Sequence, residues 1–164
     1  EVVTIRPAKP VDARRIQEHF YDLEADDVAA RFFHRKQRFD QEEVGGVSQV
    51  DYINNLTILA VVGEFGFGRV VGIGEYLLDP AVNMAEVAYS VSRSWQRKGV
   101  ARLIQQKLAM GARDKGIAGL LAYTSPENQG MIGLFHGLPY RVKTRVEDEM
   151  LVLTCRFDEP AADE

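Results

Sequence analysis

The middle of the sequence changes from one hydrophobic period to another, and this change most constrains the fold. Residues Ala85–Val91 form a short run rich in apolar side chains, which is typical of a strand. After a short basic loop, apolar side chains recur every three or four positions, at Val100, Leu103, Ile104 and Leu108. A strand that leads through a short loop into a long amphipathic helix indicates a mixed α/β domain.

The rest of the chain extends this pattern. Strands are predicted at Val2–Pro7, Leu56–Glu64, Arg69–Leu78, Ala85–Val91, Leu120–Tyr123, Arg141–Glu147 and Glu149–Phe157. Helices are predicted at Asp12–Leu23, Val28–Phe33, Val100–Lys115 and Asn128–His136, and residues 34–49 stay unassigned. We expect a single domain over residues 1–158, built on one central mixed sheet flanked by helices, and a frayed tail at 159–164.

The order of elements also predicts a topology. The strand Ala85–Val91 should pair antiparallel with Arg69–Leu78, which precedes it, and parallel with Leu120–Tyr123, which follows it. The helix Val100–Lys115 should then cross between the two parallel strands, and such crossovers are strongly right-handed.

Composition excludes several classes of function. The net charge of -4 and the pI near 5.5 argue against nonspecific nucleic-acid binding, which needs a basic face. No apolar run approaches the roughly 20 residues that span a membrane. The single cysteine, Cys155, forms no internal disulfide, so a structural role and a cytoplasmic setting are expected. The chain begins with Glu1, which fits either a piece of a longer chain or a choice of numbering.

Histidines give no sign of a metal site. His19, His34 and His136 are scattered and lack the spacing of metal ligands, so we expect no metal.

The basic loop before the long helix has the features of an anion site. Gly99 lets a ligand approach the backbone because it has no Cβ, and the first N–H groups of the helix have no internal partners. With the helix dipole and the nearby charges of Arg93, Arg97, Lys98 and Arg102, they suit a pyrophosphate. The alternative is a plain strand–loop–helix joint with solvated basic residues. No Gly-Lys-Ser/Thr follows, so the loop is not a Walker P-loop.

The loop Gln96-Arg97-Lys98-Gly99-Val100-Ala101 resembles the acetyl-CoA-binding motif of the GNAT superfamily, Arg/Gln-x-x-Gly-x-Gly/Ala, which follows the fourth strand and opens the third helix. Downstream, Asn128 matches the start of a second family motif, with Met131 in the place of its alanine and Phe135 in the place of its tyrosine. The strand Ala85–Ala88 is similar to GNAT domains of bacterial protein lysine acetyltransferases and of larger acyl-CoA-handling enzymes. The resemblance implies a GNAT-like acyl-CoA N-acyltransferase fold with a splayed sheet and acetyl-CoA as donor.

The resemblance also implies roles for single residues. Glu86 takes the proton of the attacking amine, directly or through a water. The backbone N–H of Val91 stabilises the thioester carbonyl, and Asn128 hydrogen-bonds the pantetheine arm. Many relatives use the tyrosine at this place as the acid that protonates the leaving thiolate. Phe135 cannot donate a proton, so this role has no residue at position 135. Tyr140, Tyr123 and His136 are possible substitutes.

Each role has a plainer alternative. Glu86 fits an ordinary glutamate on a half-exposed strand, with Glu75 as the reserve base. Because side chains alternate along a strand, Glu86 and Val91 should lie on opposite faces of the sheet, unless a bulge lies between them. Asn128 fits the N-cap of a short helix. Trp95 is expected to pack the loop down.

Two functions follow. The first is acetyl transfer from acetyl-CoA to a primary amine, with a protein lysine as one candidate acceptor, by direct attack in a ternary complex. The second is a noncatalytic acyl-CoA sensor within a larger enzyme. A place in a longer chain and a homodimer are both compatible with the sequence.

Overall fold

The computed structural model describes residues 2–26, 55–63 and 68–161 of the 164-residue chain. Its elements are β1 (Val3–Pro7), α1 (Ala13–Asp26), β2 (Asn55–Val62), β3 (Arg69–Asp79), β4 (Met84–Val91), α3 (Val100–Asp114), β5 (Gly119–Thr124), α4 (Gln129–His136), β6 (Tyr140–Glu147) and β7 (Met150–Pro160). Every strand predicted from the sequence is confirmed, and so are three of the four helices, with ends shifted by at most three residues. The helix predicted at Val28–Phe33 and the unassigned segment 34–49 lie outside the described residues.

The strands form one seven-stranded mixed sheet in the order β1-β2-β3-β4-β5-β7-β6. As predicted, β3 and β4 are antiparallel, β4 and β5 are parallel, and α3 connects the parallel pair. The mixed α/β class inferred from the sequence is therefore confirmed.

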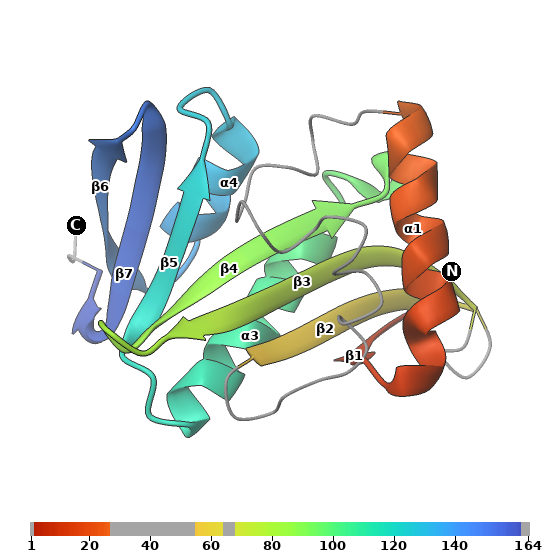
Figure 1. Ribbon diagram of the computed structural model, residues 1–164, viewed down its shortest axis with the longest axis horizontal. Coiled ribbons are helices and arrows are strands. Elements are labelled where there is room, and N and C mark those ends of the chain that lie inside the picture. The colour runs from red at the N-terminus through yellow and green to blue at the C-terminus, as the bar shows by residue number, and fades with distance from the viewer. Residues whose placement is uncertain (1, 27–54, 64–67, 162–164) are drawn as a thin grey trace.

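The sheet is splayed between β4 and β5. These strands share only three paired positions, Met84↔Gly119, Ala85↔Leu120 and Glu86↔Leu121, and then diverge. Figure 1 shows β4 and β5 separating from a common base like the arms of a V. Beyond Glu86, the second half of β4 is therefore paired with β3 alone.

Helices cover both faces of the sheet, α1 on one side and α3 with α4 on the other (Figure 1). Alternate side chains of β4 supply the two cores. Val87 packs into the same buried cluster as Ile104 of α3. Ala88, its neighbour, packs with Ile16 of α1.

Two glycines of β3 bring α3 close to the sheet. A Cβ at Gly72 would lie 2.9 Å from Cγ1 of Val100, and a Cβ at Gly74 would lie 2.3 Å from Cγ2 of Ile104. Real Cβ atoms do not approach other atoms so closely, so larger residues would push the helix away. The start of α3 is thereby held at a fixed height above β3.

The last strand is longer than predicted. β7 continues to Pro160, which lies opposite Tyr140 of β6. Glu159 and Pro160, which we expected in a frayed tail, are therefore part of the sheet, because pairing with β6 orders them. Residues 162–164 lie outside the described part of the chain.

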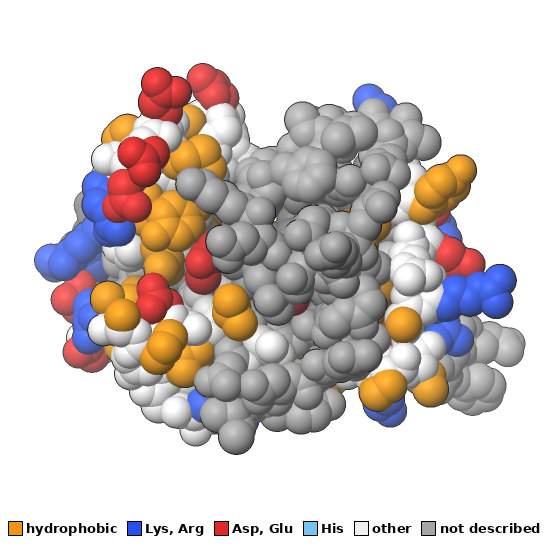
Figure 2. All heavy atoms as spheres, in the orientation of Figure 1, with side chains coloured by type: hydrophobic (Ala, Val, Ile, Leu, Met, Phe, Trp, Pro, Cys, Tyr) orange, Lys and Arg blue, Asp and Glu red, His pale blue; other side chains and the backbone are white. Residues whose placement is uncertain are grey.

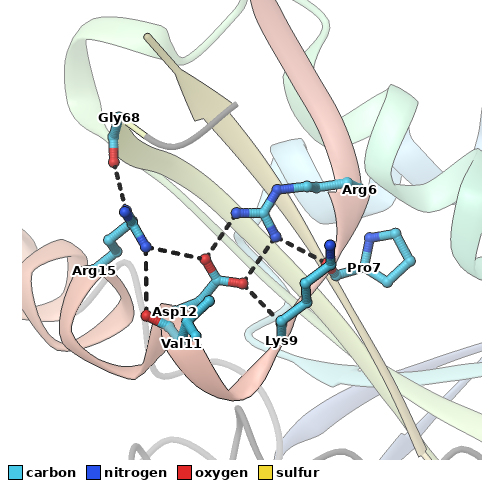
Figure 3. A network of polar contacts seen from close by, with 7 residues as sticks. All are labelled: Arg6, Pro7, Lys9, Val11, Asp12, Arg15 and Gly68. Atoms are coloured by element: carbon cyan, nitrogen blue, oxygen red, sulfur yellow. Dashed lines mark hydrogen bonds and ion pairs between the residues drawn. The ribbon is translucent and has the colours of Figure 1, made fainter. Parts of the chain in front are cut away.

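A buried carboxylate ties the start of the chain to the sheet (Figure 3). Asp12 is fully buried, and Arg6 of β1 donates to both of its oxygens, at 2.8 and 2.7 Å. The backbone N–H of Lys9 donates to Oδ2 at 2.7 Å. Arg15 of α1 lies 3.4 Å from Oδ1 and donates to the carbonyl of Gly68, beside β3, at 3.0 Å. One carboxylate thus joins β1, the first turn of α1 and the start of β3.

The charged form of Asp12 is favoured. Burial, the largest influence, raises its pKa, but the hydrogen bonds from Arg6 and Lys9 and the charges of Arg6 and Arg15 outweigh it, so the pKa falls below the ordinary 3.8. A lowered folded-state pKa contributes stability that is present above the unfolded-state pKa and is lost as the pH falls through the folded-state value.

We expect Asp12→Asn to lower the free energy of unfolding at pH 7 by about 3 kcal/mol, because it leaves a largely buried guanidinium without its partner. The difference from the wild type should shrink as the pH falls below about 4. Urea unfolding at several pH values measures both effects. Glu18→Gln, which breaks the exposed Arg14–Glu18 pair of α1, is the control and should cost less than about 0.5 kcal/mol. Equal losses in the two variants would contradict the role of Asp12.

Candidate functional site

A cavity of about 590 Å³ opens where β4 ends. It is bounded by the last residues of β4, the basic loop, the first turn of α3 and the start of α4. Seven of the residues predicted to bind the cofactor line it: Val91, Gln96, Arg97, Gly99, Val100, Ala101 and Asn128. The structure therefore brings together segments that are more than thirty residues apart in sequence.

Other residues of the cavity wall were not predicted as binding residues. These are Tyr89, Ser90, Trp95, Arg102, Gln129, Gly130, Met131, Gly133 and Leu134. Three residues of this set could have been recognised together from the sequence. Gly130, Gly133 and Leu134 have the spacing of one helical face.

The end of β4 turns one backbone edge toward the gap left by β5. The N–H of Ser92 donates to the carbonyl of Val71 in β3 at 2.8 Å. Bonding positions alternate along an antiparallel pair, so the N–H and carbonyl of Val91 point the other way, toward the diverged strand. The carbonyl of Val91 indeed accepts from Nε2 of Gln96, at 3.0 Å, on that side.

The loop between β4 and α3 is held in an unusual shape. Arg97 and Gly99 both have positive φ, 65° and 85°. Gly99 caps α3, and a Cβ there would meet nothing within 4 Å, so glycine serves its left-handed backbone conformation. Gln96, through its bond to Val91, ties the loop back to the strand.

The first turn of α3 presents donors to the cavity. The earliest hydrogen bond of the helix runs from the N–H of Leu103 to the carbonyl of Gly99, at 3.1 Å. The N–H groups of Val100, Ala101 and Arg102 therefore have no acceptor within the helix. All three residues line the cavity.

Trp95 packs against the core on the α3 side and also lines the cavity. Lys98 does not line it: its Nζ lies over the indole of Trp95, 5.3 Å from the ring centre. This cation–π contact draws the lysine onto the loop, whereas the sequence predicted it in the cofactor site.

Asn128 has a structural role as well as a place in the cavity wall. Its Oδ1 accepts from the N–H of Met131 at 3.1 Å, which caps α4, and its Nδ2 donates to the hydroxyl of buried Thr124 at 2.9 Å. The N-cap alternative is confirmed by this geometry. The same side chain joins the end of β5 to the start of α4.

Glu86 lies on the other face of the sheet from the cavity. The register between β3 and β4 is continuous along the whole of β4, so the bulge considered between Glu86 and Val91 is wrong. The irregularity lies instead between β2 and β3, where Val71 is an extra residue of β3. Glu86 consequently shares the α1 face with Ala88, and Val91 faces α3.

Glu86 occupies the point where the strands part. It is the last residue of β4 paired with β5, and its side chain is partly buried. Burial first, then the negative charges of Glu147 and Glu86, raise the pKa of Tyr123 on β5. Glu75, the reserve base, is only 1% exposed, with the hydroxyl of Thr57 3.4 Å from its Oε2. Glu86 is the more accessible of the two glutamates.

The side chains considered for the acid role lie elsewhere. Phe135 is fully buried in the core on the α3 side and does not line the cavity. The hydroxyl of Tyr140 accepts from Arg113, in the last turn of α3, at 3.1 Å. Neither Tyr123 nor the exposed His136 is among the described residues that line the cavity.

The ionisable side chains in the described ranges can also be compared with those of a metal site. Within the described ranges, no group of three or more His, Cys, Asp or Glu side chains is placed to hold a metal ion. His34 lies outside those ranges. Burial raises the pKa of Cys155, on β7, to about 11. No helix of the described part of the chain is long and apolar enough to cross a membrane.

We expect Asn128→Ala to lower the free energy of unfolding by about 2 kcal/mol, because it removes the cap of α4 and leaves the hydroxyl of Thr124 without its donor. Asn128→Asp keeps the acceptor for Met131 and should recover about half of that loss. Urea unfolding measures both. If the two variants were equally destabilised, the cap would contribute nothing.

Comparisons with known proteins agree with this geometry. The family model described as Acetyltransferase (GNAT) family matches residues 18–138. The GNAT domain of S. lividans PAT is 26% identical, with 94% of this chain and 90% of that chain covered and a TM-score of 0.78. The protein yncA from Salmonella typhimurium, solved with its cofactor acetyl-CoA, is 21% identical over 100% of this chain and 99% of that one, with a TM-score of 0.73. A cAMP-binding acyltransferase from Mycobacterium smegmatis is 20% identical over 94% of this chain but 44% of its own, with a TM-score of 0.64.

Proposed function

The chain belongs to the GNAT acetyltransferase family, and from this premise we propose that it transfers an acetyl group from acetyl-CoA to a primary amine. The observation that carries the proposal is the cavity that joins the first turn of α3 to the open edge of β4. Acetyl-CoA has a matching shape, with an anionic pyrophosphate at one end of the pantetheine arm and a thioester at the other. The similarity to yncA, solved with acetyl-CoA, supports this donor.

The pyrophosphate belongs at the start of α3. The N–H groups of Val100, Ala101 and Arg102 point along the helix axis toward the loop, where the helix dipole favours negative charge. Arg97 and Arg102 line the same cavity and add positive charge. Lys98 is held over Trp95 and contributes only to the field around the site.

The thioester belongs beside the open edge of β4. The backbone N–H of Val91 faces this gap, and a donor aimed at the carbonyl oxygen stabilises the negative charge that develops as the amine attacks. Asn128, whose side chain is already fixed by Thr124 and Met131, stands across the cavity as a partner for the pantetheine amides.

The leaving thiolate departs without help from a tyrosine at position 135. Phe135 is buried and has no proton to give. A thiol has a pKa of about 8.5, so thiolate is a fair leaving group by itself. The step therefore forms the C–N bond of the amide, breaks the C–S bond of the thioester, and releases CoA as thiolate.

The amine approaches from the α1 face, where Glu86 marks the fork of the sheet. An amine with a pKa of about 10.4 arrives mostly protonated and needs a base. Strand geometry separates the Cα atoms of Glu86 and Val91 by about 16 Å, which is more than one water bridges, so we assign the proton transfer to Glu86 through a chain of several ordered waters. Figure 2, which views this face, shows acidic and apolar side chains over β5, β7 and β6, with Lys and Arg side chains at the outer edge of the same strands; the acidic ones suit a cationic acceptor such as a protein lysine.

A second candidate function is acyl-CoA sensing without transfer. One observation favours it: the place of the family tyrosine holds buried Phe135, which has no proton to give. Acetyl-CoA consumption with a panel of amines and proteins, followed by mass spectrometry of acetylated lysates, separates the two. Tight CoA binding without any consumption would favour the sensor.

We expect Gly99→Asp to weaken CoA binding at least tenfold, because it places a carboxylate beside the pyrophosphate. The substitution meets no atom within 4 Å, so the protein should remain folded. Isothermal titration calorimetry with CoA measures the change.

Gly99→Asn is the matched control, since it has the same shape and the same cost at positive φ but no charge. It should bind CoA more tightly than Gly99→Asp by about tenfold. Gly116→Asp provides a second control at the far end of α3, where glycine also has a positive φ of 78° and a Cβ meets nothing. Unchanged CoA affinity in folded Gly99→Asp would place the pyrophosphate elsewhere.

We expect Glu86→Gln to keep CoA affinity and to lower kcat by about 10²–10⁴-fold at pH 7, because the amide has the shape of the acid but no basicity. The loss should shrink toward pH 10, where the amine is already neutral. Initial rates with acetyl-CoA and an amine acceptor that the wild type acetylates, measured across this pH range, test the trend.

Glu147→Gln removes another negative charge near Tyr123 and is the control, with a rate within about twofold of the wild type. A Glu86→Gln protein that is equally slow at every pH would assign Glu86 to positioning. Wild-type rates at pH 7 would remove it from the mechanism.

A further inference from the structure

A buried imidazole bridges the two serines that flank Val91. His19 of α1 is 1% exposed; its Nε2 lies 3.0 Å from the hydroxyl of Ser90, and its Nδ1 lies 3.3 Å from the hydroxyl of Ser92. Ser90 and Ser92 are two positions apart, so both point to the α1 face while the side chain of Val91 points to the other. The imidazole of His19 therefore contacts the strand on both sides of Val91.

The imidazole is suited to hold both hydroxyls at once. Burial, the largest influence, and the charge of Arg69 together lower its pKa to about 4, against the backbone contacts to Val70 and Ser90, which raise it. The ring is consequently neutral at neutral pH, with one nitrogen as donor and the other as acceptor. A serine hydroxyl fits either role, so both ring nitrogens are satisfied.

Besides the imidazole, the segment around Val91 is supported by pairing with β3 and by the bond from Nε2 of Gln96 to the carbonyl of Val91. On one edge, Ser92 bonds to Val71, the extra residue of β3 at the bulge. On the other edge, pairing with β5 has already ended at Glu86. Pairing with β3 sets the direction of the peptide groups here, but a strand end with a bulge on one side and a cavity on the other is held less firmly than the middle of a sheet.

We propose that His19 is a positioning residue for acetyl transfer, which holds Ser90 and Ser92 so that the N–H of Val91 between them stays directed into the gap between β4 and β5. The inference rests on the proposed function, in which this N–H stabilises the thioester carbonyl. A donor that drifts by about 1 Å loses much of its effect on the transition state, at a cost of up to about 100-fold in rate. The pyrophosphate site, on the first turn of α3, does not depend on the imidazole.

The test compares four variants of the full chain. His19→Phe keeps a ring beside Phe20 but removes both nitrogens. His19→Gln places an amide near the position of Nε2 and keeps a partner for Ser90, whereas His19→Asn keeps one near Nδ1 for Ser92. Ile16→Val, on the same buried face of α1, is the control for a change in packing alone.

Three quantities are measured for each variant: kcat and KM for acetyl-CoA, the affinity for CoA, and the midpoint of urea unfolding. We expect His19→Phe to lower kcat by about 10–100-fold with CoA affinity within about twofold, and His19→Gln or His19→Asn to recover at least part of kcat. Ile16→Val should shift the midpoint and leave kcat within about twofold. A His19→Phe protein that keeps the wild-type kcat, or that loses kcat and CoA affinity together, overturns the inference.

A second readout does not need turnover. The amide signal of Val91 in ¹H–¹⁵N spectra should differ between the CoA and acetyl-CoA complexes of the wild type, and His19→Phe should lose that difference. If the wild type shows the difference but acetylates no acceptor, the proposed function fails and the positioning role stands. If the variant shows the same difference as the wild type, the positioning role fails, whatever the activity.

Discussion

The site depends on the early end of pairing between β4 and β5. A strand in the middle of a sheet uses the backbone groups of both edges, so it has none left for a ligand. After Glu86, one edge of β4 has lost its neighbouring strand, and every second peptide group beyond that point faces a gap. A row of fixed backbone dipoles thus becomes available inside the fold, and its direction is set by the remaining pairing with β3. The cavity, the loop and the start of α4 are arranged around this edge.

Rigidity on the other side of the cavity comes from contacts with glycine. Gly72 and Gly74 let Val100 and Ile104 pack directly on the backbone of β3. The first turn of α3 and the last residues of β4 are therefore both fixed against the same strand. A site whose two halves share one support can hold a long ligand at both ends without rearrangement. The bond from Gln96 to Val91 closes the loop between those halves.

Much of the fold was predictable because its signals are local. The change of period between Ala85–Val91 and Val100–Asp114, and the glycine between them, identified the strand, the helix and the turn that joins them. The features of the fold that were predicted wrongly or missed depend on strand register and on contacts between residues far apart in the sequence. The bulge at Val71 follows from how β2 pairs with β3, and no pattern in β4 reveals it. His19 meets Ser90 across 71 positions of sequence, and no pattern in the sequence separates this histidine from the other two.

The residues of the candidate site can likewise be divided into those predictable from local sequence signals and those whose positions depend on packing. Residues next to Gly99 were found because a helix start dictates where its N–H groups point. Lys98 and Phe135, which we also predicted to bind the cofactor, do not line the cavity because their side chains follow packing: one covers an indole and the other fills the core. Gln96 lines the cavity, and its side chain donates to the carbonyl of Val91.

The burial of Cys155 has a chemical consequence for the proposed reaction, in which the protein holds a thioester. Thiolates exchange acyl groups with thioesters, and a reactive cysteine near bound acetyl-CoA would divert the acetyl group onto the protein itself. With burial raising its pKa to about 11, only about one in ten thousand of these side chains is ionised at pH 7. Because Cys155 is the single cysteine of the chain and only 2% exposed, self-acylation by thioester exchange is suppressed. In the proposed reaction, the acetyl group is thereby left to a nitrogen nucleophile.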